Sequence, residues 1–156
     1  MAYRYATWTP DLETGNAAID SQHKQLILSA NALVDAYLSG KGRQEVGTTL
    51  HFLVGYTIQH FADEEELQKK HDYPEYQTHK QAHIDFTDVV HDLTKRFSHE
   101  GFSDEFINEV YVTTTEWLFD HIRGEDLKMA AYIKSKERNI WSSVLDRALR
   151  LLNLRK

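Results

Sequence analysis

Several residue types and segment types are absent from this chain of 156 residues, and each absence excludes a class of protein. No cysteine occurs, which excludes disulfide bonds, thiolate nucleophiles, zinc ribbons and cysteine-ligated iron–sulfur clusters. Any metal ion would therefore be bound by nitrogen and oxygen. No apolar run approaches the roughly 20 residues that span a bilayer, and residues 1–10 lack the apolar stretch of a secretory signal. We therefore expect a cytoplasmic protein without a transmembrane segment, and the net charge of −6 argues against nucleic-acid binding.

Strand-like alternation is also lacking, and helical periodicity dominates between a few turn signals. Four stripes step by three and four residues, as the core-facing side of an amphipathic helix does. They are Ile19, His23, Leu26, Ala30, Leu33, Tyr37; Val46, Leu50, Leu53, Thr57, His60, Glu64, Leu67; Tyr76, His79, His83, Phe86, Val90, Leu93, Phe97; and Ile107, Val110, Thr114, Trp117, His121. Gly40, Pro74 and Gly101 mark the short connections. The pattern predicts an all-α fold, an antiparallel up-down-up-down four-helix bundle, with an N-terminal arm that packs through Trp8.

Five histidines and two carboxylates lie on these stripes or at their ends, where an apolar core would not accept them. They are His23, His60, Glu64, His79, His83, His121 and Asp126. Residues four apart on a helix point in the same direction. His60 and Glu64 would therefore present their side chains to one point in the core, and His79 and His83 would do the same from another helix.

The remaining pair, His121 and Asp126, is five residues apart and would diverge on a regular α-helix, so we expect the helix to loosen near Gly124. Taken singly, each histidine is more often a hydrogen-bonded core residue than a ligand. A metal-free core, however, would bury all seven groups together, and each uncompensated carboxylate would cost several kcal/mol. Seven ligands are too many for one ion, and nitrogen with carboxylate suits iron, manganese or zinc. We therefore expect two ions bridged by carboxylates. Two carboxylates and a bridging hydroxide would nearly neutralise two divalent ions, and a buried centre favours neutrality.

Longer stretches around these residues resemble the hemerythrins, specifically the bacterial hemerythrin-like domain, from residue 8 to about residue 132. The stretches are Ile19-Asp20-Ser21-Gln22-His23, His60-Phe61-Ala62-Asp63-Glu64-Glu65, Tyr73-Pro74 before His79-Lys80-x-x-His83-x-x-Phe86, and Trp117-Leu118-x-x-His121-Ile122 before Asp126. The resemblance implies two non-haem iron ions joined by an oxo or hydroxo bridge, with dioxygen as the ligand of one iron. Three histidines would hold the saturated iron: His79, His83 and His121. Two would hold the iron with an open position: His23 and His60. The bridging carboxylates would be Glu64 and Asp126.

The resemblance also implies an apolar pocket for dioxygen at the open iron. Its lining would be Leu26, Phe61, Trp117, Leu118 and Ile122. Such residues are also ordinary core residues, and one apolar wall can both fill space and keep water and protons away. Because this lining contains no carboxylate, the sequence favours reversible dioxygen binding, for storage, delivery or sensing, over O–O cleavage. We expect no enzyme beyond weak peroxidase-type activity. The alternatives are a di-iron oxidoreductase (a peroxidase or a nitric-oxide-handling enzyme) and an oxygen or redox signalling module.

Residues 134–156 differ in charge from the rest of the chain. They contain seven Lys or Arg against Glu137 and Asp146, a net of +5, so the remaining residues carry −11. An apolar stripe follows the same segment: Ile140, Trp141, Val144, Leu145, Ala148, Leu149 and Leu152. We expect an extra C-terminal amphipathic helix after a metal-binding bundle domain of residues 1–133. It could pack on its own bundle, contact a second copy or a partner domain through residues 140–152, or lie on an anionic membrane surface.

Overall fold

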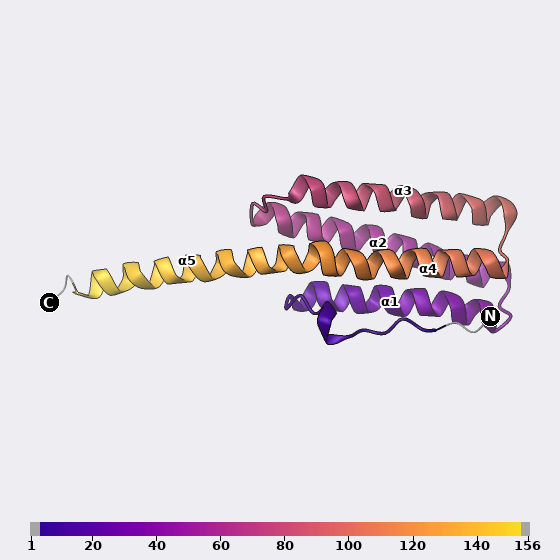
Figure 1. The fold of residues 1–156 in the computed structure, drawn as a ribbon, viewed down its shortest axis with the longest axis horizontal. Coiled ribbons are helices and arrows are strands. Elements are labelled where there is room, and N and C mark those ends of the chain that lie inside the picture. The colour runs from indigo at the N-terminus through magenta and orange to yellow at the C-terminus, as the bar shows by residue number, and fades with distance from the viewer. Residues whose placement is uncertain (1–3, 154–156) are drawn as a thin grey trace.

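The computed structural model describes residues 4–153, with side chains up to residue 150, and its helices follow the predicted order. Four of them form a bundle in which each helix runs antiparallel to the one before it in the chain (Figure 1): α1 (Ala17–Leu38), α2 (Arg43–Lys70), α3 (Tyr76–Glu100) and α4 (Asp104–His121). A single turn of 3-10 helix, Pro10–Leu12, precedes α1, and a π-helical turn, Ile122–Asp126, joins α4 to α5 (Leu127–Asn153). The predicted all-α four-helix bundle is confirmed.

The helices begin and end where local chemistry favours it. The Asn16 side chain accepts hydrogen bonds from two backbone N–H groups in the first turn of α1, at 3.1 and 3.2 Å. Ser103 caps α4 by accepting from the N–H of Phe106 at 3.2 Å. Each cap satisfies donors that have no partner within the helix. After α3 the chain turns at Gly101, whose φ of +85° is a conformation that glycine adopts without strain.

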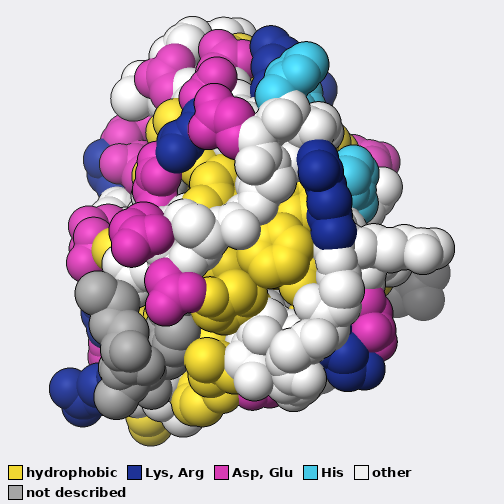
Figure 2. Space-filling view, turned by 90° about the vertical axis from the view of Figure 1, so that its right-hand side faces the viewer, with side chains coloured by type: hydrophobic (Ala, Val, Ile, Leu, Met, Phe, Trp, Pro, Cys, Tyr) yellow, Lys and Arg dark blue, Asp and Glu magenta, His cyan; other side chains and the backbone are white. Residues whose placement is uncertain are grey.

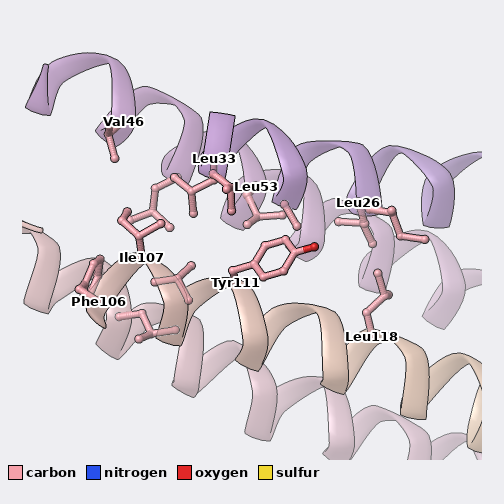
Figure 3. Packing of buried hydrophobic residues seen from close by; sticks show 14 of the residues in the cluster. Leu26, Leu33, Val46, Leu53, Phe106, Ile107, Tyr111 and Leu118 are labelled. Atoms are coloured by element: carbon pink, nitrogen blue, oxygen red, sulfur yellow. The ribbon is translucent and has the colours of Figure 1, made fainter. Parts of the chain in front are cut away.

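The main apolar core extends from the end of the bundle opposite to α5 to Ile122, in the turn that joins α4 to α5. Figure 3 shows side chains from α1 and α2, including Leu33 and Leu53, meeting side chains from α4, including Ile107 and Tyr111. Leu33 and Ile107 are completely buried. Burial of one such side chain contributes about 1.5–3 kcal/mol.

The N-terminal arm is fastened to α1 and α4, as predicted. The Tyr111 hydroxyl accepts from the Ala6 N–H at 2.6 Å and donates to the Arg4 carbonyl at 3.0 Å. Asn31 donates from its side-chain amide to the Ala6 carbonyl at 2.9 Å. Trp8 is half-buried and packs against the main core.

Seen from the end of the bundle opposite to α5, Asp and Glu side chains gather on one side of the surface (Figure 2).

The C-terminal helix α5 begins on the bundle and then leaves it. Met129 and Ile133 are buried at 1% and 7% exposure, whereas each residue from 137 to 150 is exposed. Figure 1 shows this part of α5 projecting past the end of the bundle. Residues 137–150 therefore do not pack on their own bundle, and the interpretation in which residues 134–156 do so is wrong for this part of the segment. Among those residues, no helix has the length and apolar character needed to cross a membrane.

Candidate metal centre

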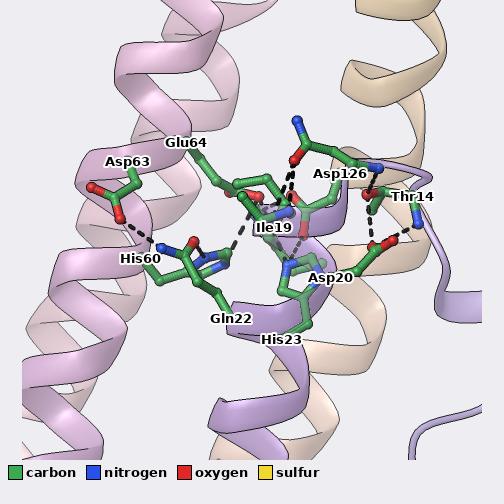
Figure 4. Close-up of polar contacts among 12 residues, drawn as sticks. Thr14, Ile19, Asp20, Gln22, His23, His60, Asp63, Glu64 and Asp126 are labelled. Carbon is green, nitrogen blue, oxygen red and sulfur yellow. Dashed lines mark hydrogen bonds and ion pairs between the residues drawn. The ribbon is translucent and has the colours of Figure 1, made fainter.

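All seven predicted ligand residues meet inside the half of the bundle next to α5, and each is at most 6% exposed. Figure 4 shows four of them, from α1, α2 and the π-turn, pointing toward one another. The seven form two groups, within which the ligand atoms lie no more than 4.8 Å apart. One group is Glu64, His79, His83 and His121; the other is His23, His60, Glu64 and Asp126. The five histidines divide between the groups as the resemblance implied, and Glu64 is common to both groups; that these residues bind metal stays a prediction.

The three histidines of the first group point their Nε2 atoms at one another. The Nε2 distances are 3.1 Å from His79 to His83, 3.0 Å from His83 to His121, and 3.1 Å from His121 to His79. Each Nε2 is either a donor or an acceptor, so three mutual contacts cannot all be hydrogen bonds. Histidine nitrogens bind metal ions at about 2.1 Å, so two of them at right angles around one ion lie about 3.0 Å apart. The spacing therefore fits three ligands of a single ion.

Glu64 directs one carboxylate oxygen to each group. Its Oε1 lies 3.8 Å from Nε2 of both His23 and His60. Its Oε2 lies 3.5 Å from Nε2 of His79 and 3.4 Å from Nε2 of His83. A carboxylate whose two oxygens face two separate sets of imidazoles has the geometry to bridge two cations.

Asp126 repeats this arrangement from the opposite side. Its Oδ2 lies 3.1 Å from Nε2 of His23, and its Oδ1 lies 3.3 Å from Nε2 of His79 and 3.2 Å from Nε2 of His121. The π-turn makes this possible, because the Leu127 N–H bonds to the carbonyl five residues earlier and so one more residue fits into the turn. The predicted loosening of the helix near Gly124 is confirmed.

Charge is strongly coupled within the cluster. Burial and the neighbouring Asp126 both act to raise the pKa of Glu64, but the surrounding imidazoles outweigh them and lower it to about 2. Burial acts to lower the pKa of His79, but the nearby carboxylates of Asp126 and Glu64 outweigh it and raise the pKa to about 9. Burial lowers the pKa of His60 to about 4, against the attraction of Glu64. The two carboxylates thus stay ionised in the core and attract positive charge to it.

Several buried polar atoms of the cluster lack a hydrogen-bond partner. They are Nδ1 and Nε2 of His23, Nε2 of His60, Nδ1 of His79, and both carboxylate oxygens of Glu64 and Asp126. A buried donor or acceptor without a partner costs about 1–3 kcal/mol, and more when it is charged. Divalent cations would be bound by the Nε2 atoms and the carboxylate oxygens of this set and would neutralise the carboxylates. The donor set, nitrogen and carboxylate without sulfur, fits iron.

Two residues that the sequence analysis did not assign to the site orient its histidines. The side chain of Gln22 extends from α1 to α2. Its Oε1 is 3.0 Å from Nδ1 of His60, and its Nε2 donates to Asp63 at 2.6 Å (Figure 4). A hydrogen bond at Nδ1 leaves Nε2 of His60 free to bind metal. Glu65 approaches Nδ1 of His83 in the same way, at 3.4 Å. The only sequence signal was that Gln22 directly precedes one predicted ligand, His23, and Glu65 directly follows another, Glu64.

The residues predicted to line the oxygen pocket separate into two sets. Leu26, Leu118 and Ile122 are buried in the main apolar core. Phe61 stacks on His83 with ring centroids 3.9 Å apart, and Trp117 stacks on His121 at 4.3 Å. Phe61 and Trp117 therefore cover rings of the three-histidine group. Their part in an oxygen pocket stays a prediction. The other four histidines lie outside both groups: His51, His71, His91 and His99.

Comparison with known proteins identifies the family. The family model of the hemerythrin HHE cation binding domain matches residues 14–133. The chain belongs to the hemerythrin family. It is similar to a bacteriohemerythrin of Stenotrophomonas maltophilia, with 36% identity over 128 residues, 82% of this chain and 81% of that protein. It is also similar to a bacteriohemerythrin of Methylococcus capsulatus, with 35% identity over 121 residues, 77% of this chain and 90% of that protein.

Solved structures agree with this assignment. A crystal structure of wild-type hemerythrin superposes with a TM-score of 0.73 at 28% identity, covering 83% of this chain and 98% of that chain. Hemerythrin family membership and the buried histidine–carboxylate cluster together suggest a di-iron, oxygen-binding domain.

Proposed function

We propose that this member of the hemerythrin family binds dioxygen reversibly at two non-haem iron ions, for oxygen storage, delivery or sensing. The ligands would be His79, His83 and His121 for one iron, His23 and His60 for the other, and Glu64 and Asp126 for both. Two ferrous ions, when bound, supply the electrons that dioxygen binding requires. The chain itself contributes the geometry of the ligands and the environment around them.

The distribution of ionisable groups in the described interior carries this proposal. Besides the seven ligand residues, the buried ionisable side chains are Asp20, Tyr73 and Tyr111, and the Tyr111 hydroxyl bonds to the N-terminal arm at Ala6 and Arg4. Asp20 accepts three hydrogen bonds, from the N–H and hydroxyl of Thr14 at 2.9 and 2.8 Å and from the N–H of Gly15 at 3.1 Å. Burial and nearby carboxylates raise the pKa of Tyr73 to about 12, and its ring lies by His79, in the three-histidine group. Other residues thus hold the Asp20 carboxylate and the Tyr111 hydroxyl, and Tyr73 keeps its proton at neutral pH. None of the three is placed to act as the general acid that cleavage of the O–O bond needs.

Apolar side chains complete this environment. Leu26 is 1% exposed, Leu118 is 3% exposed and Ile122 is fully buried. They exclude water from the core beside the cluster, and water supplies the protons that promote irreversible oxidation. Gln22 holds the His60 ring so that Nε2 faces the cluster. A site with these properties favours binding and release over chemical conversion.

Anaerobic reconstitution with ferrous iron tests the proposal. We expect two irons per chain and an absorption band that appears when oxygen is admitted and disappears when oxygen is removed. Immediate oxidation that oxygen removal does not reverse would refute reversible binding and favour the di-iron oxidoreductase alternative.

A matched pair of variants in α1 tests the role of the apolar wall. Leu26→Glu introduces a carboxyl group into the core, whereas Leu28→Glu introduces the same group at a position that is 60% exposed. We expect the reversible band to decay faster in Leu26→Glu and at the original rate in Leu28→Glu, compared at equal iron content and equal helicity. Equal decay rates would contradict the role given to the apolar wall.

A further inference from the structure

An apolar stripe on the projecting part of α5 is left uncovered by the rest of the described chain. Its members and their exposed fractions are Ile140 52%, Trp141 68%, Val144 49%, Leu145 61% and Leu149 57%. Ile140 lies seven residues after Ile133, which on an α-helix places both on the same face. The stripe therefore continues, beyond the bundle, the face through which α5 packs on it.

The base of this stripe opens into a pocket of about 310 Å³ at the point where α5 leaves the bundle. Leu67, Met129 and Ile133 form its apolar part, and Lys134 and Glu137 line it where the projecting part of α5 begins. An apolar face that runs from a pocket along a helix is the kind of surface that another amphipathic helix covers.

The base of the projecting segment is held in a fixed direction. Lys136 forms an ion pair with Asp72 at 2.8 Å and also donates to the carbonyl of His71. The Tyr132 hydroxyl donates to the carbonyl of Asp72 at 3.0 Å. These bonds join α5 to the turn after α2, so the stripe is presented in one orientation, which lowers the entropic cost of association.

We propose that two copies of this chain pair through their α5 helices, antiparallel and centred near Ser142, to form a dimer with the two bundles at opposite ends. Glu137 and Arg147 each lie five residues from Ser142. Antiparallel pairing about Ser142 therefore brings Glu137 of each copy level with Arg147 of the other. It also brings Ile140 level with Val144, in the middle of the apolar stripe.

Charge selects this direction over the parallel one. Parallel pairing would set Glu137 level with Glu137 and Arg147 level with Arg147, and like charges at such positions destabilise paired helices. It would also place the two bundles side by side, although residues 1–133 carry a net charge of −11. Antiparallel pairing separates the bundles and brings Arg147 and Arg150 of each copy toward the acidic bundle of the other.

A second copy also fits the stripe better than an anionic membrane does. Helices that lie on such membranes carry Lys and Arg along the polar face. The polar face of the projecting part of α5 carries Asn139, Ser142, Ser143, Asp146 and Arg150, so its one positive charge is matched by one negative charge. The acidic bundle would in addition be repelled by an anionic surface.

Sedimentation equilibrium of the full iron-loaded chain tests the dimer. We expect a mass of twice 18.2 kDa that falls to the monomer mass on dilution. Val144→Glu, in the stripe, should raise the dissociation constant at least tenfold, whereas Ser143→Glu, the adjacent residue on the polar face, should change it less than threefold. Iron content should stay the same in both, since neither residue contacts the metal centre. A monomer at all concentrations, a dimer insensitive to Val144→Glu, or a monomer that binds anionic vesicles through the stripe would overturn the proposal.

Two measurements test the direction of pairing. Because the chain has no cysteine, single spin labels can be attached at Ser142→Cys and Ser135→Cys. In an antiparallel pair centred on Ser142, the labels at residue 135 should lie roughly 21 Å apart along the axis, since each is seven residues from the centre at 1.5 Å per residue, and the labels at 142 should lie level. Equal distances at both positions would show parallel pairing and overturn the proposed arrangement.

Glu137→Arg and Arg147→Glu should each weaken the dimer, and their combination should restore it; failure of the combination would overturn the register.

Discussion

Replacing Phe61 by alanine tests how much the packing of α2 around the metal centre contributes to the stability of the protein. Phe61 is 4% exposed. Its ring stacks on His83 at 3.9 Å and meets Trp117 edge-on at 5.4 Å. Phe52, on the same helix, is 52% exposed and provides a matched control.

The magnitudes follow from burial. Truncation of a buried phenylalanine to alanine typically lowers the free energy of unfolding by about 3–5 kcal/mol, because it removes apolar contacts and leaves a cavity. Truncation of an exposed residue usually changes it by about 0.5 kcal/mol or less. For a chain of this size each kcal/mol corresponds to about 2–4 °C. We therefore expect Phe61→Ala to lower the melting temperature by about 6–20 °C and Phe52→Ala by about 2 °C or less.

Thermal unfolding followed by circular dichroism measures these shifts, in iron-loaded and metal-free protein. Iron content and the lifetime of the oxygen-dependent band should be recorded on the same samples. Phe61→Ala should shorten that lifetime because the cavity admits water next to His83, whereas Phe52→Ala should leave it unchanged. Similar melting temperatures for the two variants, or an unchanged lifetime in Phe61→Ala, would refute the reasoning.

Two further predictions concern the ligands. His60→Ala should lower the iron bound per chain, whereas His91→Ala, at an exposed position outside the cluster, should leave it unchanged; equal loss in both would contradict the assignment. In metal-free protein, the raised pKa of His79, about 9, gives stability that is present below pH 6.5 and lost as the pH rises to 9. The lowered pKa of His60, about 4, gives stability that is lost as the pH falls from 6.5 to 4. The urea midpoint of metal-free protein should therefore be highest near pH 6.5, and a flat midpoint from pH 4 to 9 would contradict both shifts.

The bundle and most of the seven-residue cluster were predictable from the sequence because they depend on helical periodicity, whereas Asp126 requires in addition that the helix loosen near Gly124. The spacing of His60 and Glu64 fixes their common direction on one helix, and the structure places them together. The bond between Gln22 and His60 was not predictable, since it depends on how α1 and α2 pack against each other. A glutamine beside a histidine in sequence gives no information about a histidine on another helix.

The course of the C-terminal segment was not predictable for a related reason. Its amphipathic pattern predicted the helix but not the partner of its apolar face, and packing on its own bundle was one reasonable interpretation. Its course depends on whether the chain turns after Asp126, and no proline or glycine follows Asp126 to break the helix. The helix continues instead, and Ile140 and Trp141 are carried past the bundle.

The π-turn connects the metal centre with the projecting helix. On a regular α-helix Asp126 would lie about 140° around the axis from His121, since five residues rotate by about 100° each. A loop after His121 could also bring the carboxylate inward, but it would interrupt the helix and leave the direction of α5 undetermined. The π-turn accommodates the additional residue while the Leu127 N–H still bonds to the carbonyl of Ile122. One local change in helical hydrogen bonding thus directs Asp126 toward the histidines and keeps α5 nearly in line with α4 (Figure 1), so that the apolar stripe faces outward beyond the bundle.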